Sequence, residues 1–227
     1  MKVLVTGATG YIGGRLVPLL LEKGHSVRVL VRDPARLKDR PWTDRVEVVQ
    51  GDVASSDSMA EAVRGMDAAY YLVHSMCSGP DFALRDRRAA EGFAEAAQGI
   101  GQVIYLGGIL PEAEGGRGSK HLRSRAEVGE ILRAHLPTTE VRAGPIIGSG
   151  SASFEMVRYL TERLPVMVAP KWIENRQPPT KGSRSSNQRS KQASCLKEMF
   201  VVGISCASNG IVNTLSPRRL IDWIGKR

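Results

Sequence analysis

The sequence predicts an α/β protein built on a doubly wound parallel sheet, and two observations carry this prediction. Strand-like apolar segments alternate with amphipathic helix-like segments along most of the 227 residues. A short apolar run at residues 3–5 also leads directly into three glycines, Gly7, Gly10 and Gly13, after which a helical pattern begins. Strand, glycine turn and helix in this order present backbone N–H groups and a helix N-terminus to a phosphate. The start of the chain therefore predicts a dinucleotide-binding turn.

The first elements follow from local patterns. The helix after the glycines has an apolar face made of Ile12, Leu16, Leu19 and Leu20. Gly24 is a predicted C-cap for this helix. The second strand is expected at residues 25–31 and the third at residues 46–50, where Gly51 and Asp52 close it.

The later elements continue the same alternation. Ser58 and Glu61 have the spacing of a capping box, so we expect a short helix over residues 58–65. The other helices are expected at residues 82–98, 121–134 and 154–164, and the other strands at residues 68–73, 102–106 and from residue 140. This order predicts a Rossmann sheet over residues 1–176, with its ligand at the carboxyl ends of the strands.

Residues 177–227 differ from the rest of the chain. They carry nine basic and two acidic residues, so most of the net charge of +9 lies in them. Three interpretations remain open: a divergent or disordered extension, a basic arm for nucleic acid or another anionic surface, and the translation of a disrupted reading frame. Few aromatic residues accompany these charges, which disfavours nucleic-acid binding through base stacking.

Neither a membrane span nor a metal site is expected. No apolar run approaches the roughly 20 residues that cross a bilayer, and a first strand starting at residue 2 leaves no room for a signal peptide. The three cysteines, Cys77, Cys195 and Cys206, are odd in number and too far apart to form a metal knuckle. We therefore expect reduced thiols in a cytoplasmic protein.

The motifs together resemble the short-chain dehydrogenase/reductase superfamily, in its extended and atypical branches, which include the NmrA-like NAD(P)-binding proteins. The resemblance covers about residues 1–176 and is carried by residues 6–14 (TGATGYIGG), 31–34 (VRDP), 51–53 (GDV), 71–74 (YLVH), 105–108 (YLGG) and 142–148 (RAGPIIG). It implies cofactor contacts for Gly7, Thr9, Gly10, Tyr11, Ile12, Gly13, Asp52 and Val53. Asp52 resembles the aspartate that contacts the adenine amine, and its alternative role is to cap the turn after Gly51.

The end of the second strand bears on the choice of nicotinamide cofactor. An acid at this place binds the ribose 2′-hydroxyl of NAD, whereas an arginine accommodates the 2′-phosphate of NADP. Arg32 and Asp33 stand there side by side, and Arg36 follows one helical turn later. Two guanidiniums near a dianionic phosphate favour NADP, with Asp33 capping the next turn. NAD stays open, as does a role for both arginines as solvated surface residues.

The usual catalytic pair of the superfamily is missing. Relatives carry Tyr-x-x-x-Lys on the helix after the fifth strand and a serine at the end of that strand. Here the strand ends Leu106-Gly107-Gly108, and His121 and Arg125 hold the i and i+4 positions of the helix. His121 is a candidate proton donor and Arg125 a positional or electrostatic partner, because an arginine does not act as a base. The alternative is a helix start with solvated polar residues.

His74 ends the fourth strand and is a candidate for the cofactor's nicotinamide side; alternatively it simply closes the strand. Two functions follow from these residues. One is an NADP-linked oxidoreductase acting on a small or lipid-like carbonyl or quinone. The other is a non-catalytic NAD(P)-binding redox sensor or assembly factor, which the absence of Tyr-x-x-x-Lys favours.

Overall fold

The computed structural model describes residues 1–75, 81–109 and 119–143, together with residues 146, 148, 150, 151, 155, 158, 159, 162, 163 and 204–206. The chain forms two compact units, Met1–Gly144 with Gly203–Arg227, and Pro145–Val202. The predicted boundary at residue 176 and nearly all of the predicted basic tail lie outside the described residues. Five residues of the predicted helix at residues 154–164 are described, and all five are helical.

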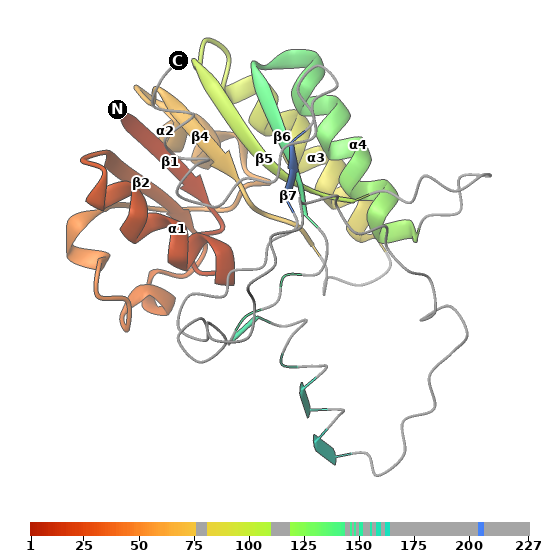
Figure 1. Ribbon diagram of the computed structural model, residues 1–227. Helices are drawn as coiled ribbons and strands as arrows, with labels where there is room; N and C mark the ends of the chain where they lie inside the picture. The colour runs from red at the N-terminus through yellow and green to blue at the C-terminus, as the bar shows by residue number, and fades with distance from the viewer. Residues whose placement is uncertain are drawn as a thin grey trace, which may run out of the picture. The chain divides into compact units, whose positions relative to one another are not determined.

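The first unit contains a seven-stranded sheet in the order β3-β2-β1-β4-β5-β6-β7 (Figure 1). The strands are β1 (Lys2–Thr6), β2 (Ser26–Val31), β3 (Glu47–Gln50), β4 (Ala68–Tyr71), β5 (Gln102–Gly108), β6 (Thr138–Ala143) and β7 (Ile204–Cys206). The first six are parallel, and β7 pairs with β6 in the antiparallel direction. Strand order reverses between β1 and β4, as the doubly wound prediction requires, so that prediction is confirmed. The short β7 was not predicted.

Helices connect the parallel strands and pack against the sheet. The α-helices are α1 (Tyr11–Glu22), α2 (Ser56–Val63), α3 (Phe82–Ala96) and α4 (Lys120–His135), and two 3₁₀ turns are η1 (Pro34–Leu37) and η2 (Thr43–Arg45). The helix α3 packs between α2 and α4, and α1 packs on β1 and β2 (Figure 1). No helix among the residues described is long and apolar enough to cross a membrane.

The main hydrophobic core lies between the sheet and helices α2, α3 and α4. Leu4, Tyr71 and Phe93 are buried in it, and the Tyr71 and Phe93 rings meet edge to face at 5.0 Å between centroids. Burial also raises the pKa of Tyr71 well above its ordinary value, so this phenol stays neutral. The aromatic pair holds α3 against the middle of the sheet.

Three element ends differ from or refine the predictions. Ser55, rather than Ser58, caps α2, because its hydroxyl accepts the Ser58 N–H at 3.4 Å; the predicted capping box is therefore wrong. The strand β4 ends two residues early, since the Leu72 N–H donates to the side-chain hydroxyl of Thr6 at 3.2 Å. Gly24 ends α1 as predicted, although the C-cap itself is Lys23 and Gly24 follows it in a Schellman motif. The φ of Gly24 is +78°, and the N–H groups of Gly24 and His25 donate to the carbonyls of Leu21 and Leu20 at 3.1 and 3.0 Å.

The C-terminus of α2 is capped from outside the helix by Arg28 of β2. Its Nη1 donates to three backbone carbonyls, those of Glu61 at 3.2 Å, Ala62 at 2.9 Å and Arg64 at 2.9 Å. Its Nε forms an ion pair with Glu47 of β3 at 2.9 Å. One guanidinium therefore satisfies carbonyls that a helix end leaves open and ties α2 to two strands.

Replacing Arg28 with methionine keeps the aliphatic stem and removes every donor. We expect the free energy of unfolding to fall by about 2 kcal/mol, the scale of hydrogen bonds from a charged donor. Urea unfolding followed by circular dichroism measures the change, with Arg88→Met as the control because Arg88 is exposed on α3. An Arg28→Met variant as stable as the control contradicts the capping role.

Candidate functional site

The glycine turn between β1 and α1 is held in a shape that side chains would disrupt. Gly7 has φ +74°, and its carbonyl accepts the Gly10 N–H at 3.0 Å. A Cβ on Gly13 would lie 2.4 Å from that carbonyl oxygen and 2.6 Å from the Cα of Ala8. Gly13 therefore lets the first turn of α1 rest directly on the backbone of the turn.

The N-terminus of α1 is open to an anion. Gly10 is its N-cap, no side chain caps it, and its first turn holds no acidic residue. The N–H groups of a helix's first turn and the positive end of its dipole face the residues that precede the helix, which here are the glycine turn. A phosphate group fits here on the chemistry of the donors alone.

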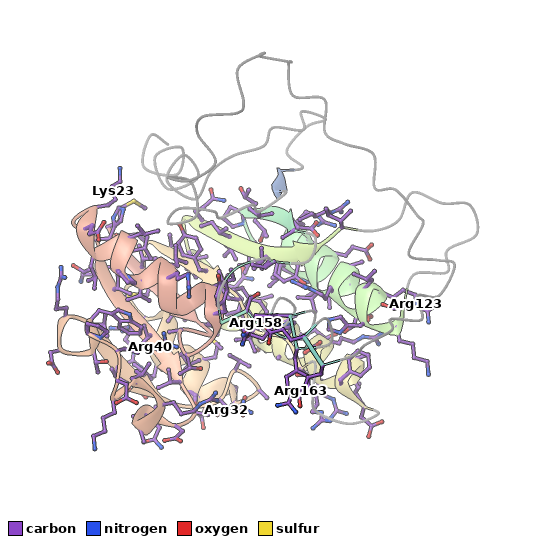
Figure 2. The ribbon with its side chains drawn as sticks, turned by 60° about the horizontal axis from the view of Figure 1, so that its bottom comes forward. Lys23, Arg32, Arg40, Arg123, Arg158 and Arg163 are labelled. Carbon is purple, nitrogen blue, oxygen red and sulfur yellow. The ribbon has the colours of Figure 1, made fainter. Side chains whose placement is uncertain are left out.

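Arg40 supports the same turn, and sequence reasoning missed it. Its Nη2 donates to the carbonyl of Thr9 at 3.3 Å. A Cβ on Gly14 would lie 2.8 Å from Nη1 of Arg40, so a fourth glycine makes room for this guanidinium. The extra glycine at position 14 was the only signal in the sequence. Figure 2 shows Arg40 and Arg32 on the α1 side of the fold.

A cleft of about 350 Å³ opens at the carboxyl ends of β1, β2, β3 and β4, the edge of the sheet where the fold places a ligand. Its lining contains Gly7, Thr9, Gly10, Leu30, Val31, Arg32, Gly51, Asp52, Val53, Ala54, Leu72, Val73, His74, Ser75, Arg85 and Ala89. Seven predicted cofactor residues meet in it: Gly7, Thr9, Gly10, Arg32, Asp52, Val53 and His74.

The other four predicted cofactor residues do not line this cleft. Gly13 contacts the backbone of the glycine turn and not the cleft. The centroid of the Tyr11 ring lies 4.0 Å from Cζ of Arg15, whose guanidinium stacks over it. Ile12 is half-buried in the first turn of α1, and Arg36 is exposed on η1. The structure thus does not bring Arg36 to the cleft beside Arg32.

A second cation reaches the cleft from an unpredicted direction. Arg85 stands on the first turn of α3 and lines the same cleft as Arg32, which follows β2. No sequence pattern marks Arg85, because only the packing of α3 brings it to the strand ends.

The carboxylates of Asp33 and Asp52 both accept hydrogen bonds from backbone N–H groups nearby in the sequence. The Asp33 carboxylate caps η1 by accepting the Ala35 N–H at 3.0 Å. The Asp52 carboxylate accepts the Ala54 N–H at 3.0 Å through Oδ1, closing the turn that leads to α2. Arg32, by contrast, forms no ion pair among the described residues, and its side chain is exposed at the cleft.

His121 lies on the first turn of α4, which Ser119 caps by accepting the Leu122 N–H at 3.2 Å. The His121 ring stands 5.9 Å from the ring of His74 and 5.9 Å from that of Phe82, measured between centroids. Its Nε2 is buried and has no hydrogen-bond partner within the described part of the chain. One nitrogen of this imidazole is therefore enclosed by the described residues without a hydrogen bond to any of them, and His121 itself does not line the cleft.

Arg125 is fixed one turn further along α4. Its Nη2 donates to the carbonyl of Leu106 at 2.6 Å, and its own carbonyl accepts the hydroxyl of Tyr105 at 2.8 Å. Both bonds tie α4 to the end of β5. The guanidinium is therefore a fixed positive charge beside His121.

Steric crowding explains why β5 ends in two glycines, Gly107 and Gly108. A Cβ on Gly107 would lie 2.5 Å from Oε1 of the buried Glu140, and one on Gly108 would lie 2.9 Å from Cδ2 of Leu122. A serine at either position needs its neighbour to move. The side chains of Glu140 and Leu122 therefore occupy the space that a serine at the end of β5 would need.

Both imidazoles are held toward the neutral form. Desolvation by burial, followed by the charge of Arg125, lowers the pKa of His121 below its ordinary value, while Asp86 acts in the opposite direction. Desolvation and then Arg125 and His121 lower the pKa of His74, whose ring remains partly accessible, and Asp86 again opposes them. Near neutral pH both rings are mostly uncharged.

The comparisons with known proteins agree with this geometry. A family profile described as NAD(P)H-binding matches residues 7–141, which is more than half of the chain. The chain belongs to this family. It is an NAD(P)-binding protein of the atypical short-chain dehydrogenase/reductase type, as its motifs predicted. In the described parts of this NAD(P)-binding protein, no group of three or more His, Cys, Asp or Glu side chains is arranged to hold a metal ion.

Among curated proteins, the chain is 33% identical over 106 residues to a 3 beta-hydroxysteroid dehydrogenase/Delta 5-->4-isomerase of Mycobacterium tuberculosis, covering 47% of this chain and 28% of that protein. It is 34% identical over 140 residues to a (4-alkanoyl-5-oxo-2,5-dihydrofuran-3-yl)methyl phosphate reductase of Streptomyces griseus, covering 62% of this chain and 46% of that one. The chain thus spans about a quarter to a half of the length of these relatives. They support an oxidoreductase-like NAD(P)-binding protein.

Solved structures show the same fold. The Bordetella bronchiseptica enzyme WbmH in complex with NAD+ matches with a TM-score of 0.59 and 20% identity, covering 71% of this chain and 61% of that one. The Citrobacter sp. triphenylmethane reductase complexed with NADP(H) matches with a TM-score of 0.54 and 20% identity, covering 71% of this chain and 55% of that one. One neighbour therefore holds NAD and the other NADP(H), on the same architecture.

Proposed function

We propose that this protein is an NADP(H)-dependent oxidoreductase that reduces a small or lipid-like carbonyl or quinone. The preference for NADP(H) over NAD(H) is supported by the different positions of the Arg32 and Asp33 side chains. The Asp33 carboxylate is engaged in capping η1, whereas Arg32 lines the cleft. A guanidinium at this place suits a ribose 2′-phosphate, whereas the Asp33 carboxylate lies outside the cleft lining and is a poor partner for a 2′-hydroxyl.

The residues of the cleft fit the rest of a dinucleotide. The open N-terminus of α1 suits the pyrophosphate. Val53 and Ala89 provide apolar surface for an adenine ring, and Asp52 stands beside them to accept from its amine. Arg85 adds a second positive charge at the cleft.

In the proposed reaction the cofactor supplies the hydride and residues of α4 supply the proton and a positive charge. When bound, the nicotinamide supplies the hydride that adds to the substrate's carbonyl carbon. His121 would then give a proton from Nε2 to the carbonyl oxygen, and Arg125 would steady the developing negative charge from its fixed position. His121 would be reprotonated from solvent before the next turnover.

A non-catalytic NAD(P)-binding sensor or assembly factor is the second candidate. Its support is the absence of the Tyr-x-x-x-Lys pair together with a His121 that is mostly neutral near pH 7. Steady oxidation of NADPH by a panel of quinones and aldehydes favours the enzyme. NADPH binding without turnover of any panel member favours the sensor.

Replacing Arg32 with alanine tests the cofactor. We expect NADPH binding to weaken about 10- to 100-fold, because a charge-assisted contact to a phosphate contributes roughly 1.5–3 kcal/mol. NADH binding should change little. Fluorescence titration at one fixed salt concentration measures both, since phosphate contacts are screened by salt.

Two matched variants complete this test. Arg45→Ala removes an exposed arginine from η2, outside the cleft lining, and should leave both affinities unchanged. Arg36→Ala shows whether the predicted second guanidinium contributes. Tighter binding of NADH than NADPH by the wild type would refute the choice of NADP, and binding of neither would refute the cofactor itself.

A further inference from the structure

A buried carboxylate lies next to the proposed proton donor. Asp86 of α3 is only 5% exposed, and within the described part of the chain it forms no salt bridge. Its Oδ1 accepts the Ser75 N–H at 2.9 Å, and its Oδ2 accepts the hydroxyl of Ser124 at 3.2 Å. Burying an acid without an ion-pair partner is costly, so we expect the charge of Asp86 to serve a function.

The two partners of Asp86 belong to the two histidine segments. Ser75 follows His74 directly in the segment after β4, and Ser124 lies three residues after His121, on the same face of α4. One carboxylate on α3 therefore holds both segments. An ion pair between Arg87 and Glu127 also joins α3 to α4, but at a partly exposed place.

We propose that Asp86 is a positioning residue that holds His74, in the segment after β4, and His121, on the first turn of α4, side by side and supplies the negative charge that their protonated forms need. The inference rests on the proposed role of His121 as proton donor. No other described acid is bonded to both segments.

The charges around the two rings explain why this carboxylate matters. Burial and Arg125 of α4 disfavour a proton on either imidazole, and His121 adds to that effect at His74. Asp86 of α3 is the group that favours the proton at both rings. Without its charge, an imidazolium at either position would lie near Arg125 with no other described acid to offset the repulsion.

The test follows the imidazoles themselves and needs neither cofactor nor substrate. Asp86→Asn keeps an oxygen to accept from Ser75 and an amide to meet Ser124, but loses the charge. We expect NMR titration of the ring protons to show the midpoints of both His74 and His121 at lower pH than in the wild type. His25 and His135, elsewhere in the fold, serve as internal references and should not move.

Glu91→Gln is the matched control, because it removes the same charge from an exposed position of the same helix. It should leave all four midpoints in place. Unchanged midpoints of His74 and His121 in Asp86→Asn would overturn the proposal, as would equal shifts in Glu91→Gln. A purely structural role of Asp86 would not move these titrations in a folded variant.

Ser124→Ala carries the test if Asp86→Asn does not fold. It keeps the carboxylate and removes one of its two anchors. We expect the nuclear Overhauser contacts of the His121 ring with His74 and Phe82 to weaken, and unchanged contacts would contradict the positioning role.

Cofactor binding separates this proposal from the proposed function. Asp86 itself does not line the cleft, and in Asp86→Asn the amide oxygen can still accept the N–H of Ser75, which does, so this variant should bind NADPH as tightly as the wild type. A wild type that binds no NADPH refutes the proposed function, while the imidazole titrations still decide the role of Asp86. A loss of NADPH affinity in Asp86→Asn alone would instead assign the carboxylate to the cofactor site and overturn its role as a positioning residue.

Discussion

Replacing Gly13 with alanine is expected to abolish NADPH binding, with a loss of at least about 100-fold in affinity. The new Cβ would lie 2.4 Å from the carbonyl oxygen of Gly7 and 2.6 Å from the Cα of Ala8. These are backbone atoms, so the turn or the helix must move, and misplacing a binding group by about 1 Å costs on the order of 100-fold. Stability should fall as well, by about 1–3 kcal/mol, the usual cost of overpacking.

Gly92→Ala is the matched control for this change. Gly92 lies in α3, and a Cβ there would meet nothing within 4 Å. This variant should bind NADPH normally and gain up to about 1 kcal/mol, because alanine is the better helix former. Fluorescence titration and thermal unfolding measure both variants. Wild-type affinity in Gly13→Ala would mean that the turn does not hold the dinucleotide.

Replacing His121 with phenylalanine is expected to reduce kcat by about 100- to 10,000-fold, the contribution of a general acid. Phenylalanine fills the space of the ring beside Phe82 and His74 but donates no proton. His121 does not line the cleft, so the Kd for NADPH should stay within about twofold of the wild type. A twofold change is small, because a tenfold change in Kd corresponds to about 1.4 kcal/mol of binding free energy. A proportional loss of NADPH affinity would assign His121 to cofactor binding instead of proton transfer.

The pH profile of the wild type gives a second readout of the same role. Reduction needs the protonated imidazole, and burial with Arg125 lowers the pKa of His121 below its ordinary value. The rate of reduction should therefore rise as pH falls through that lowered pKa and decline on the alkaline side. The reverse oxidation needs the neutral ring and should show the opposite trend. His121→Phe should lose this dependence.

The glycine turn is predictable from sequence because its determinants are local. Gly7 needs a positive φ and Gly13 a missing Cβ, and both needs arise within seven residues of chain. The alternation of strands and helices likewise fixes a parallel sheet, since each crossover has one favoured hand. Element ends were harder to predict. Ser55 replaced Ser58 as the cap of α2, because the turn closed by Asp52 delivers Ser55 to the helix start.

Contacts between distant segments were not predictable from one sequence. Arg28 caps a helix more than thirty residues away, and Arg40 reaches Thr9 across a distance of 31 residues. Neither guanidinium differs in the sequence from a solvated surface arginine. Arg85 likewise reaches the cleft only through the packing of α3, whereas Arg36, with the more suggestive position in the sequence, lies outside the lining.

By itself, the sequence determined that this chain has the fold and the turn of an NAD(P)-binding protein, and that the helix after its fifth strand lacks the Tyr-x-x-x-Lys pair. Only the tertiary structure showed which charges have partners: Asp33 is engaged in capping η1, Arg32 is left at the cleft, and Asp86 is bonded to the segments of both His74 and His121. The physical reason is the separation along the chain over which each interaction acts. Backbone conformation follows from neighbours along the chain, whereas the partner of a charge is set by whichever segment packs beside it.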